Sequence, residues 1–184
     1  MKTTSIVFGI ILLCISIAGF AGETSYEDAV SRWQSHKDVG DWLKNNFSFD
    51  KTRQRTIHKR LKSQGPSGLL VRAPERFYYS SRGYCADAAN FSIKTLNKMD
   101  LAYNARWVFI WNKKGSRHHW VAAFDYEGKL YIMDYGTGKK WIAMQGIHGP
   151  YNSLGEYCEF LASLRVPGFE VDDVVFRDMP GGED

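Results

Sequence analysis

Three short strings in this sequence carry side chains that together could catalyse acyl transfer. Residues 83–85 end in Cys85, a pair of histidines follows at His118 and His119, and the third string begins with Asp134. A thiol nucleophile, an imidazole base and a carboxylate that orients the base are the parts of a cysteine acyl-transfer triad. The sequence therefore indicates Cys85, one of the two histidines and Asp134 as candidate catalytic residues.

Cys85 is predicted to start a helix that packs against the core. The apolar positions that follow it recur at helical spacing, at Ala88, Ala89, Ile93 and Leu96. A helix N-terminus carries partial positive charge and unpaired N–H groups, which favour a thiolate and can stabilise an oxyanion. Gly83 permits a sharp turn just before this helix. The local sequence thus suits Cys85 to the role of nucleophile.

Downstream of this helix the apolar pattern changes to that of strands. Residues 107–111 are all apolar, which is typical of a strand buried on both faces. Residues 118–126 and 129–135 are predicted to form a β-hairpin, closed by a two-residue turn at residues 127–128. Both histidines and the aspartate therefore belong to one hairpin.

The register of this hairpin selects the histidine that faces the carboxylate. Counting back from a two-residue turn places Val121 opposite Asp134. Because side chains alternate along a strand, His119 shares a face with Val121 and lies one diagonal step from Asp134, within reach of a hydrogen bond. His118 points to the other face, and a slip of one residue would exchange the two histidines. His119 is the expected base, and His118 is the alternative.

These strings resemble the transglutaminase-like superfamily, which includes bacterial transglutaminase-like cysteine peptidases within the broader papain-like fold. The likeness extends over residues 74–164 and is carried by Gly-Tyr-Cys-Ala-Asp-Ala-Ala at 83–89, His-Trp-Val at 119–121 and Gly-Lys-Leu-Tyr-Ile-Met-Asp at 128–134. The resemblance implies that Cys85 is the nucleophile, His119 the base and Asp134 the third member of the triad.

The resemblance also implies a fold of the α+β class. Its core is papain- or transglutaminase-like, with the nucleophile-bearing helix packed on an antiparallel sheet and with additional N-terminal helices. One domain is expected over residues 22–178, with a helical part at about 24–70 and a catalytic core at about 74–165. The Gly- and Pro-rich tail at 179–184 is expected to be disordered.

The N-terminal part of the domain is predicted to be helical. Capping residues precede helices over residues 25–37 and 51–63, and a short helix is expected at 41–46. The 51–63 helix contains six Lys and Arg residues. We interpret them as a solvated face rather than an anion-binding or cell-envelope surface.

The first residues of the chain have the pattern of a secretory signal. Lys2 precedes an apolar stretch at 6–20, and small residues follow it, so residues 1–21 are predicted to be a signal peptide cleaved after Ala21. A retained membrane anchor is the alternative, although the stretch is shorter than the ~20 residues that a spanning helix needs. The prediction is a secreted or periplasmic protein without stable membrane insertion after cleavage.

Cleavage of the signal leaves two cysteines, Cys85 and Cys158. A disulfide between them is an alternative to a free nucleophile. Cys158 lies on an apolar helical stripe, where a cysteine is typically a small core residue. A metal centre built from Cys85, Asp134 and both histidines is disfavoured, because adjacent strand residues point to opposite faces. No metal and no cofactor are predicted.

The overall composition indicates no nucleic-acid partner. The chain has 24 Lys and Arg against 20 Asp and Glu, a net charge of +4, which is too modest an excess to indicate one. The leading interpretation is an exported cysteine-dependent hydrolase or acyl transferase that acts on protein or peptide amide bonds through a thioester. The alternative is a catalytically silent binding or scaffold domain in the cell envelope. A reactive Cys85 would distinguish the enzyme from the scaffold domain. The sequence predicts no oligomeric state.

Overall fold

A computed structural model describes residues 24–115 and 117–184 of the chain. The predicted signal peptide, its cleavage site and the possible anchor lie outside the described residues. Within the described part, no helix is long and apolar enough to cross a membrane.

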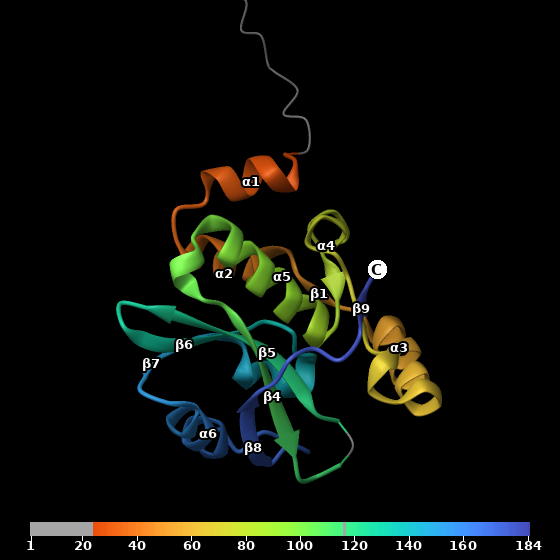
Figure 1. The fold of residues 1–184 in the computed structure, drawn as a ribbon. Helices are drawn as coiled ribbons and strands as arrows, with labels where there is room; N and C mark the ends of the chain where they lie inside the picture. Colours follow the sequence, from red (N-terminus) through yellow and green to blue (C-terminus); the bar gives the residue numbers. More distant parts are fainter. Residues whose placement is uncertain (1–23, 116) are drawn as a thin grey trace, which may run out of the picture.

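A five-stranded antiparallel sheet forms the centre of the fold, with its strands in the order β7-β6-β5-β4-β8 (Figure 1). The strands are β4 (Arg106–Asn112), β5 (His119–Tyr126), β6 (Lys129–Asp134), β7 (Gly146–Tyr151) and β8 (Val171–Phe176). The central strand β5 is buried from His119 to Phe124. Such continuous burial requires cover on both faces of the sheet, which explains its run of mainly apolar residues.

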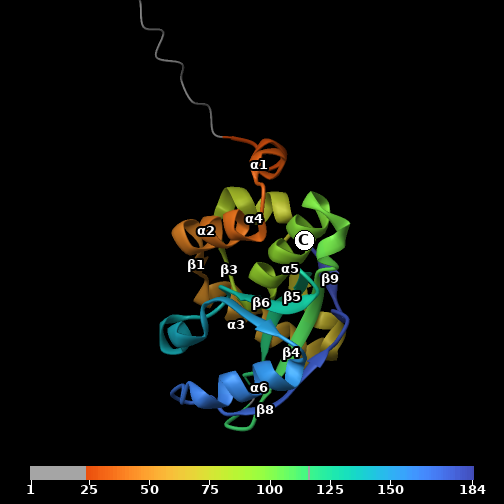
Figure 2. The ribbon, with the colours of Figure 1, turned by 90° about the vertical axis from the view of Figure 1, so that its left-hand side faces the viewer.

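Helices lie on both sides of the sheet (Figures 1 and 2). One side holds α1 (Tyr26–Arg32), α2 (His36–Asn46), α4 (Pro74–Ser80) and α5 (Cys85–Met99), and the other holds α6 (Leu154–Ser163). Phe91 of α5 joins Ala122 and Phe124 of β5 in one core cluster. Tyr157 of α6 joins Val121 in a second cluster across the sheet. Alternate residues of β5 therefore supply two cores.

The predicted α+β fold class is confirmed. The helix that begins at Cys85 packs on an antiparallel sheet, and additional N-terminal helices lie on its outer side (Figure 2). The predicted helix at 51–63 is α3 (Lys51–Gln64), and the Asp50 side chain caps it by accepting the N–H groups of Thr52 and Arg53 at 3.0 Å.

One predicted helix boundary is wrong. The expected helix over residues 25–37 ends at Arg32, and α2 begins anew at His36 and runs to Asn46. The cause is a second cap, because the Asp38 carboxylate accepts the backbone N–H groups of Gln34 and Ser35 at 2.9 Å. A cap of this kind starts a new helix inside what looks like a continuous helical pattern.

The expected disorder of residues 179–184 is also wrong. Gly182–Glu183 forms β9, which pairs in parallel with β2 (Leu70–Val71). Asp184 accepts two hydrogen bonds from the Arg53 guanidinium, at 2.7 and 3.1 Å. A strand of two residues and an ion pair with a distant residue produce no periodic pattern in the sequence. The Gly- and Pro-rich composition therefore led to a wrong prediction of disorder. A matching short pair joins β1 (Ser48–Phe49) to β3 (Arg82–Gly83).

Candidate active site

A buried carboxylate fixes the start of α5. Asp87 is fully buried and accepts the backbone N–H of Tyr84 at 3.0 Å and that of Arg72 at 2.8 Å. It also receives two hydrogen bonds from Arg53 of α3, at 2.7 and 3.0 Å. A Cβ at Gly83 would lie only 2.7 Å from the Asp87 Cβ, so the approach requires glycine. Asp87 therefore caps α5, as expected of a first-turn acid, and holds α3 against it.

The predicted register of the β5–β6 hairpin is confirmed. Tyr126 pairs with Lys129 and Ala122 with Met133, which leaves Val121 opposite Asp134. Glu127 and Gly128 both have positive φ, at 52° and 72°. Two such residues form the tight turn whose twist matches that of the flanking strands.

This register brings His119 and Asp134 together. The His119 Nε2 and the Asp134 Oδ2 lie 2.7 Å apart, and both residues are 1% exposed. Asp134 Oδ1 accepts the backbone N–H of Gly136 at 3.2 Å, which fixes the carboxylate. Burial by itself lowers the pKa of His119, but the Asp134 charge and hydrogen bond, with a further contribution from Cys85, raise that pKa to about 10. The ring is therefore built to carry a proton at neutral pH.

Cys85 is the first residue of α5 and is 8% exposed. Both Cys85 and Cys158 are free thiols, so the structure contains no bridge between them. The segment after Asp134 passes very close to Cys85, because a Cβ at Gly136 would clash with the Cys85 Cα. Gly136 thus allows the hairpin end that carries Asp134 to reach the N-terminus of α5.

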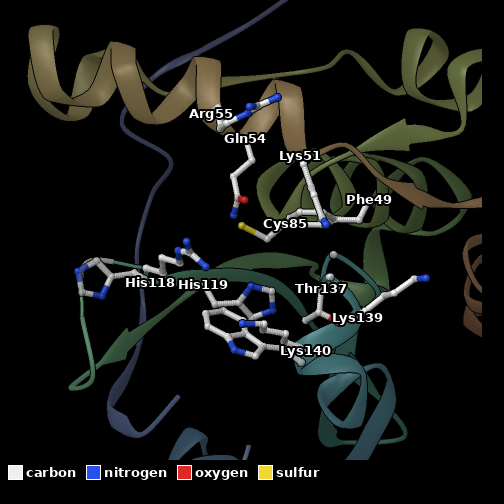
Figure 3. Close-up of a pocket in the computed structure, with 14 residues that line it drawn as sticks. Phe49, Lys51, Gln54, Arg55, Cys85, His118, His119, Thr137, Lys139 and Lys140 are labelled. Atoms are coloured by element: carbon white, nitrogen blue, oxygen red, sulfur yellow. The ribbon is translucent and has the colours of Figure 1, made fainter. Parts of the chain in front are cut away.

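A cavity of about 490 Å³ opens over Cys85 and His119 (Figure 3). One wall comes from α3 and the neighbouring Phe49, and the opposite wall from η3 (Lys139–Met144) and the residues before it. The lining residues are Phe49, Lys51, Gln54, Arg55, Cys85, Arg117, His118, His119, Gly136, Thr137, Gly138, Lys139, Lys140 and Trp141. A substrate in this cavity would contact both the thiol and the imidazole.

His118 has a different environment from His119. Its Nδ1 accepts the backbone N–H of Asn112 at 3.2 Å, and its ring packs against Phe109 and Trp111. Figure 3 shows the ring directed away from Cys85, although the residue belongs to the rim of the cavity. Of the two histidines, the structure brings His119 to Asp134, as the hairpin count predicted.

Gln54 is a residue of this site that sequence reasoning missed. Its side chain points from α3 towards Cys85 in the lining of the cavity (Figure 3), and a carboxamide can donate a hydrogen bond to an oxyanion. The sequence contained no local signal for it, because Gln54 lies on a helix interpreted as solvated. Its position depends on the tertiary contact of the preceding residue, Arg53, with Asp87.

Among residues 24–115 and 117–184, no group of three or more His, Cys, Asp or Glu side chains is arranged to hold a metal ion. His119 instead bonds Asp134 and lines one cavity together with Cys85.

The fold brings a cysteine at the start of a helix and a histidine–aspartate pair of an antiparallel sheet together at one site. The sequence profile of the family described as "Transglutaminase-like domain" matches residues 26–142. The chain belongs to this family. The match contains Cys85, His119 and Asp134.

Two solved structures of LapG from Legionella pneumophila are similar to the chain. One is 15% identical, with 81% of each chain covered and a TM-score of 0.36. The other, described as EGTA-treated, is 17% identical, with a TM-score of 0.32; the match covers 58% of the present chain and 66% of that LapG chain, just under two thirds. No curated protein matches the chain in sequence.

Replacing Asp134 by Asn is expected to destabilise the protein more at about pH 6 than at about pH 10. The folded state raises the pKa of His119 from 6.5 to about 10, so folding binds a proton. This stabilisation is complete below the unfolded pKa and is lost as the pH rises through the folded pKa. Urea unfolding of the wild-type protein and of Asp134→Asn at both pH values measures the difference in the free energy of unfolding.

Asp178→Asn is the matched control for this comparison, because Asp178 is exposed and forms no ion pair with any described residue. Its effect should be small at both pH values. A penalty for Asp134→Asn that grows towards pH 10 would contradict the assignment of the buried charge to His119.

Proposed function

We propose that this protein is an exported cysteine-dependent hydrolase or acyl transferase that acts on amide bonds of proteins or peptides. Cys85, His119 and Asp134 form its catalytic triad. The observation that carries the proposal is the buried 2.7 Å contact between His119 and Asp134, in a cavity that also holds Cys85 at the start of α5. Membership of the transglutaminase-like family supports it. Export rests on the signal pattern of residues 1–21.

The reaction begins with a proton transfer. His119 takes the thiol proton of Cys85, which produces a thiolate and an imidazolium, and Asp134 stabilises the positive ring. The thiolate then attacks the carbonyl carbon of the amide, and the carbonyl oxygen becomes an oxyanion. The Cys85 backbone N–H, at the N-terminus of α5, and the carboxamide of Gln54 are the donors available to that oxyanion.

The second half of the reaction releases the products. The C–N bond breaks as the imidazolium of His119 gives its proton to the leaving amine, and a thioester on Cys85 remains. Water attacks the thioester in hydrolysis, or a second amine attacks it in transfer. His119 accepts the proton of the attacking group, and the Cys85 thiolate departs as the acyl group leaves. The thiolate and the imidazolium are thereby restored as a pair.

Alkylation of the two cysteines against pH tests this proposal. The folded protein is treated with iodoacetamide, and labelling at each cysteine is followed by peptide mass spectrometry. Cys85 is expected to react about 100-fold faster than Cys158 at neutral pH, since general acid–base partners contribute factors of that order. Cys158 is a suitable internal standard, because burial raises the pKa of its thiol.

A Cys85→Ala variant verifies which peptide carries the fast label. Equally slow labelling of both cysteines in the folded wild-type protein would exclude a working thiolate–imidazolium pair. The protein would then have to be a binding or scaffold member of its family.

A further inference from the structure

The cavity over Cys85 has a one-sided charge. Five of its lining side chains are cations, and none of the described residues that line it is Asp or Glu. The cations are Lys51, Arg55, Arg117, Lys139 and Lys140, all of them exposed. Two basic residues of the 51–63 helix, interpreted from the sequence as a solvated face, are exposed and also line the candidate site.

These five cations have no carboxylate partner among the described residues. Nearby surface lysines differ in this respect. Lys113 and Lys114, close to Arg117 in the chain, form ion pairs with Asp172 and Glu170 at 3.5 and 3.3 Å. The positive charge around the cavity over Cys85 is therefore not neutralised by carboxylates. Like charges held together in this way attract an anionic ligand.

The cations lie on both walls of the cleft. Lys51 and Arg55 are four residues apart on α3 and so share a helix face, whereas Lys139 and Lys140 belong to η3 on the opposite wall (Figure 3). Cys85 lies between the two walls (Figure 3). A chain that crosses the thiol would meet positive charge on either side of the reacting carbonyl.

The cavity over Cys85 has a smaller neighbour. A second cavity of about 310 Å³ shares Arg117, Lys140 and Trp141 with the first and continues to Pro167 and Gly168. The two cavities therefore adjoin at these shared residues. An extended peptide that crosses Cys85 has room to continue past Arg117 towards the second cavity.

On the basis of the proposed function, we propose that the substrate is an acidic peptide segment, in which Glu or Asp residues flank the amide that reacts with Cys85. Carboxylate side chains would pair with Lys51 and Arg55 on one wall and with Lys139 and Lys140 on the other. Guanidinium groups bind carboxylates through paired hydrogen bonds. The apolar surface of Trp141 would contact the methylene groups of the same side chains.

Three peptidyl chloromethyl ketones provide the probes for a test: Ac-Glu-Glu-Gly, Ac-Gln-Gln-Gly and Ac-Lys-Lys-Gly. Each reagent forms a thioether with Cys85 and releases chloride, and intact mass gives the rate. At about 0.05 M salt the Glu reagent is expected to react about 10-fold faster than the Gln reagent, and the Lys reagent more slowly. The differences should shrink at about 1 M salt, where charges are screened beyond about 3 Å.

Two double variants locate the effect. Lys139→Gln/Lys140→Gln should reduce the ratio of the Glu rate to the Gln rate about threefold or more, the scale of two exposed charge interactions. Lys44→Gln/Lys94→Gln changes the net charge equally, at exposed lysines that do not line the cavity. This control should keep the wild-type ratio. A ratio that falls equally in both variants would overturn the proposal.

Iodoacetamide labelling of the same samples separates this inference from the proposed function. Fast iodoacetamide labelling of Cys85 with equal rates for the three peptidyl reagents overturns the acidic specificity alone. Slow iodoacetamide labelling overturns both. Protection of Cys85 by a polyglutamate decapeptide supports the peptide assignment, whereas stronger protection by an oligothymidylate of equal charge overturns it.

Discussion

Replacing His119 by Ala is expected to slow the alkylation of Cys85 at neutral pH by about 100-fold, within the range observed for the loss of a positioned acid–base partner. The variant lacks the imidazolium that stabilises the thiolate. It also leaves the Asp134 carboxylate buried without its partner at 2.7 Å. The rate of Cys85 labelling, divided by that of Cys158 in the same sample, measures the effect and corrects for reagent and temperature.

His118→Ala is the matched control. His118 precedes His119 directly, lies on the rim of the same cavity and packs against Phe109 and Trp111. Its removal is expected to leave the Cys85 labelling rate nearly unchanged. If His118→Ala were the slow variant and His119→Ala the fast one, the base would have to be reassigned. Circular dichroism of both variants verifies that they remain folded.

The second large effect is expected on stability. Asp87→Ala should lower the free energy of unfolding by about 3–5 kcal/mol, the cost of removing one partner of a buried ion pair. The Arg53 side chain is 12% exposed and would keep only Asp184. The backbone N–H groups of Tyr84 and Arg72 would lose their acceptor as well. Urea denaturation followed by tryptophan fluorescence measures the loss.

Asp184→Ala serves as the comparison for this variant. It removes the other carboxylate bound by Arg53. The Asp184 side chain is 37% exposed, so the free energy of unfolding is expected to fall by about 1 kcal/mol or less. A similarly small loss for Asp87→Ala would contradict the role of Asp87 as the centre of the contact between α3 and α5. If Asp87→Ala does not fold at all, that result agrees with the prediction. The milder variant Asp87→Asn then allows a loss in the free energy of unfolding to be measured.

The two predictions concern different parts of one site. His119 and Asp134 belong to a hairpin, whereas Asp87 at the start of α5 binds Arg53 of α3, which also binds Asp184. Loss of the first pair is expected to remove the proposed chemistry from a folded protein. Loss of the second also disturbs the wall that carries Gln54, Lys51 and Arg55.

Local sequence was sufficient wherever a structure depends on near neighbours. A two-residue turn sets the hairpin register, because strand side chains alternate strictly and one slip would expose the buried face. The order of residues along the hairpin is therefore enough to pair His119 with Asp134. Asp50 marked the start of α3, because a cap acts within one turn. The break between α1 and α2 was missed because the cap at Asp38 falls inside a continuous helical pattern.

Contacts between distant segments were beyond the reach of the sequence patterns. The pairing of β9 with β2 joins residues more than a hundred positions apart, and two residues are too few to show a strand period. The face of α3 that overlooks Cys85 depends on the ion pair of Arg53 with Asp87. For the same reason, the basic residues of that helix could not be assigned to a cleft.

The sequence by itself determined the helix that begins at Cys85, the hairpin register and the pairing of His119 with Asp134, because each follows from residues a few positions apart. The tertiary structure decided how the C-terminal segment packs, which side chain reaches Cys85 from α3, and that cations from three separate segments surround one cavity. The positive charge of this cavity comes from elements that are far apart in the sequence. Only the packing of α3, η3 and the loop before β5 around a common space brings that charge to the thiol.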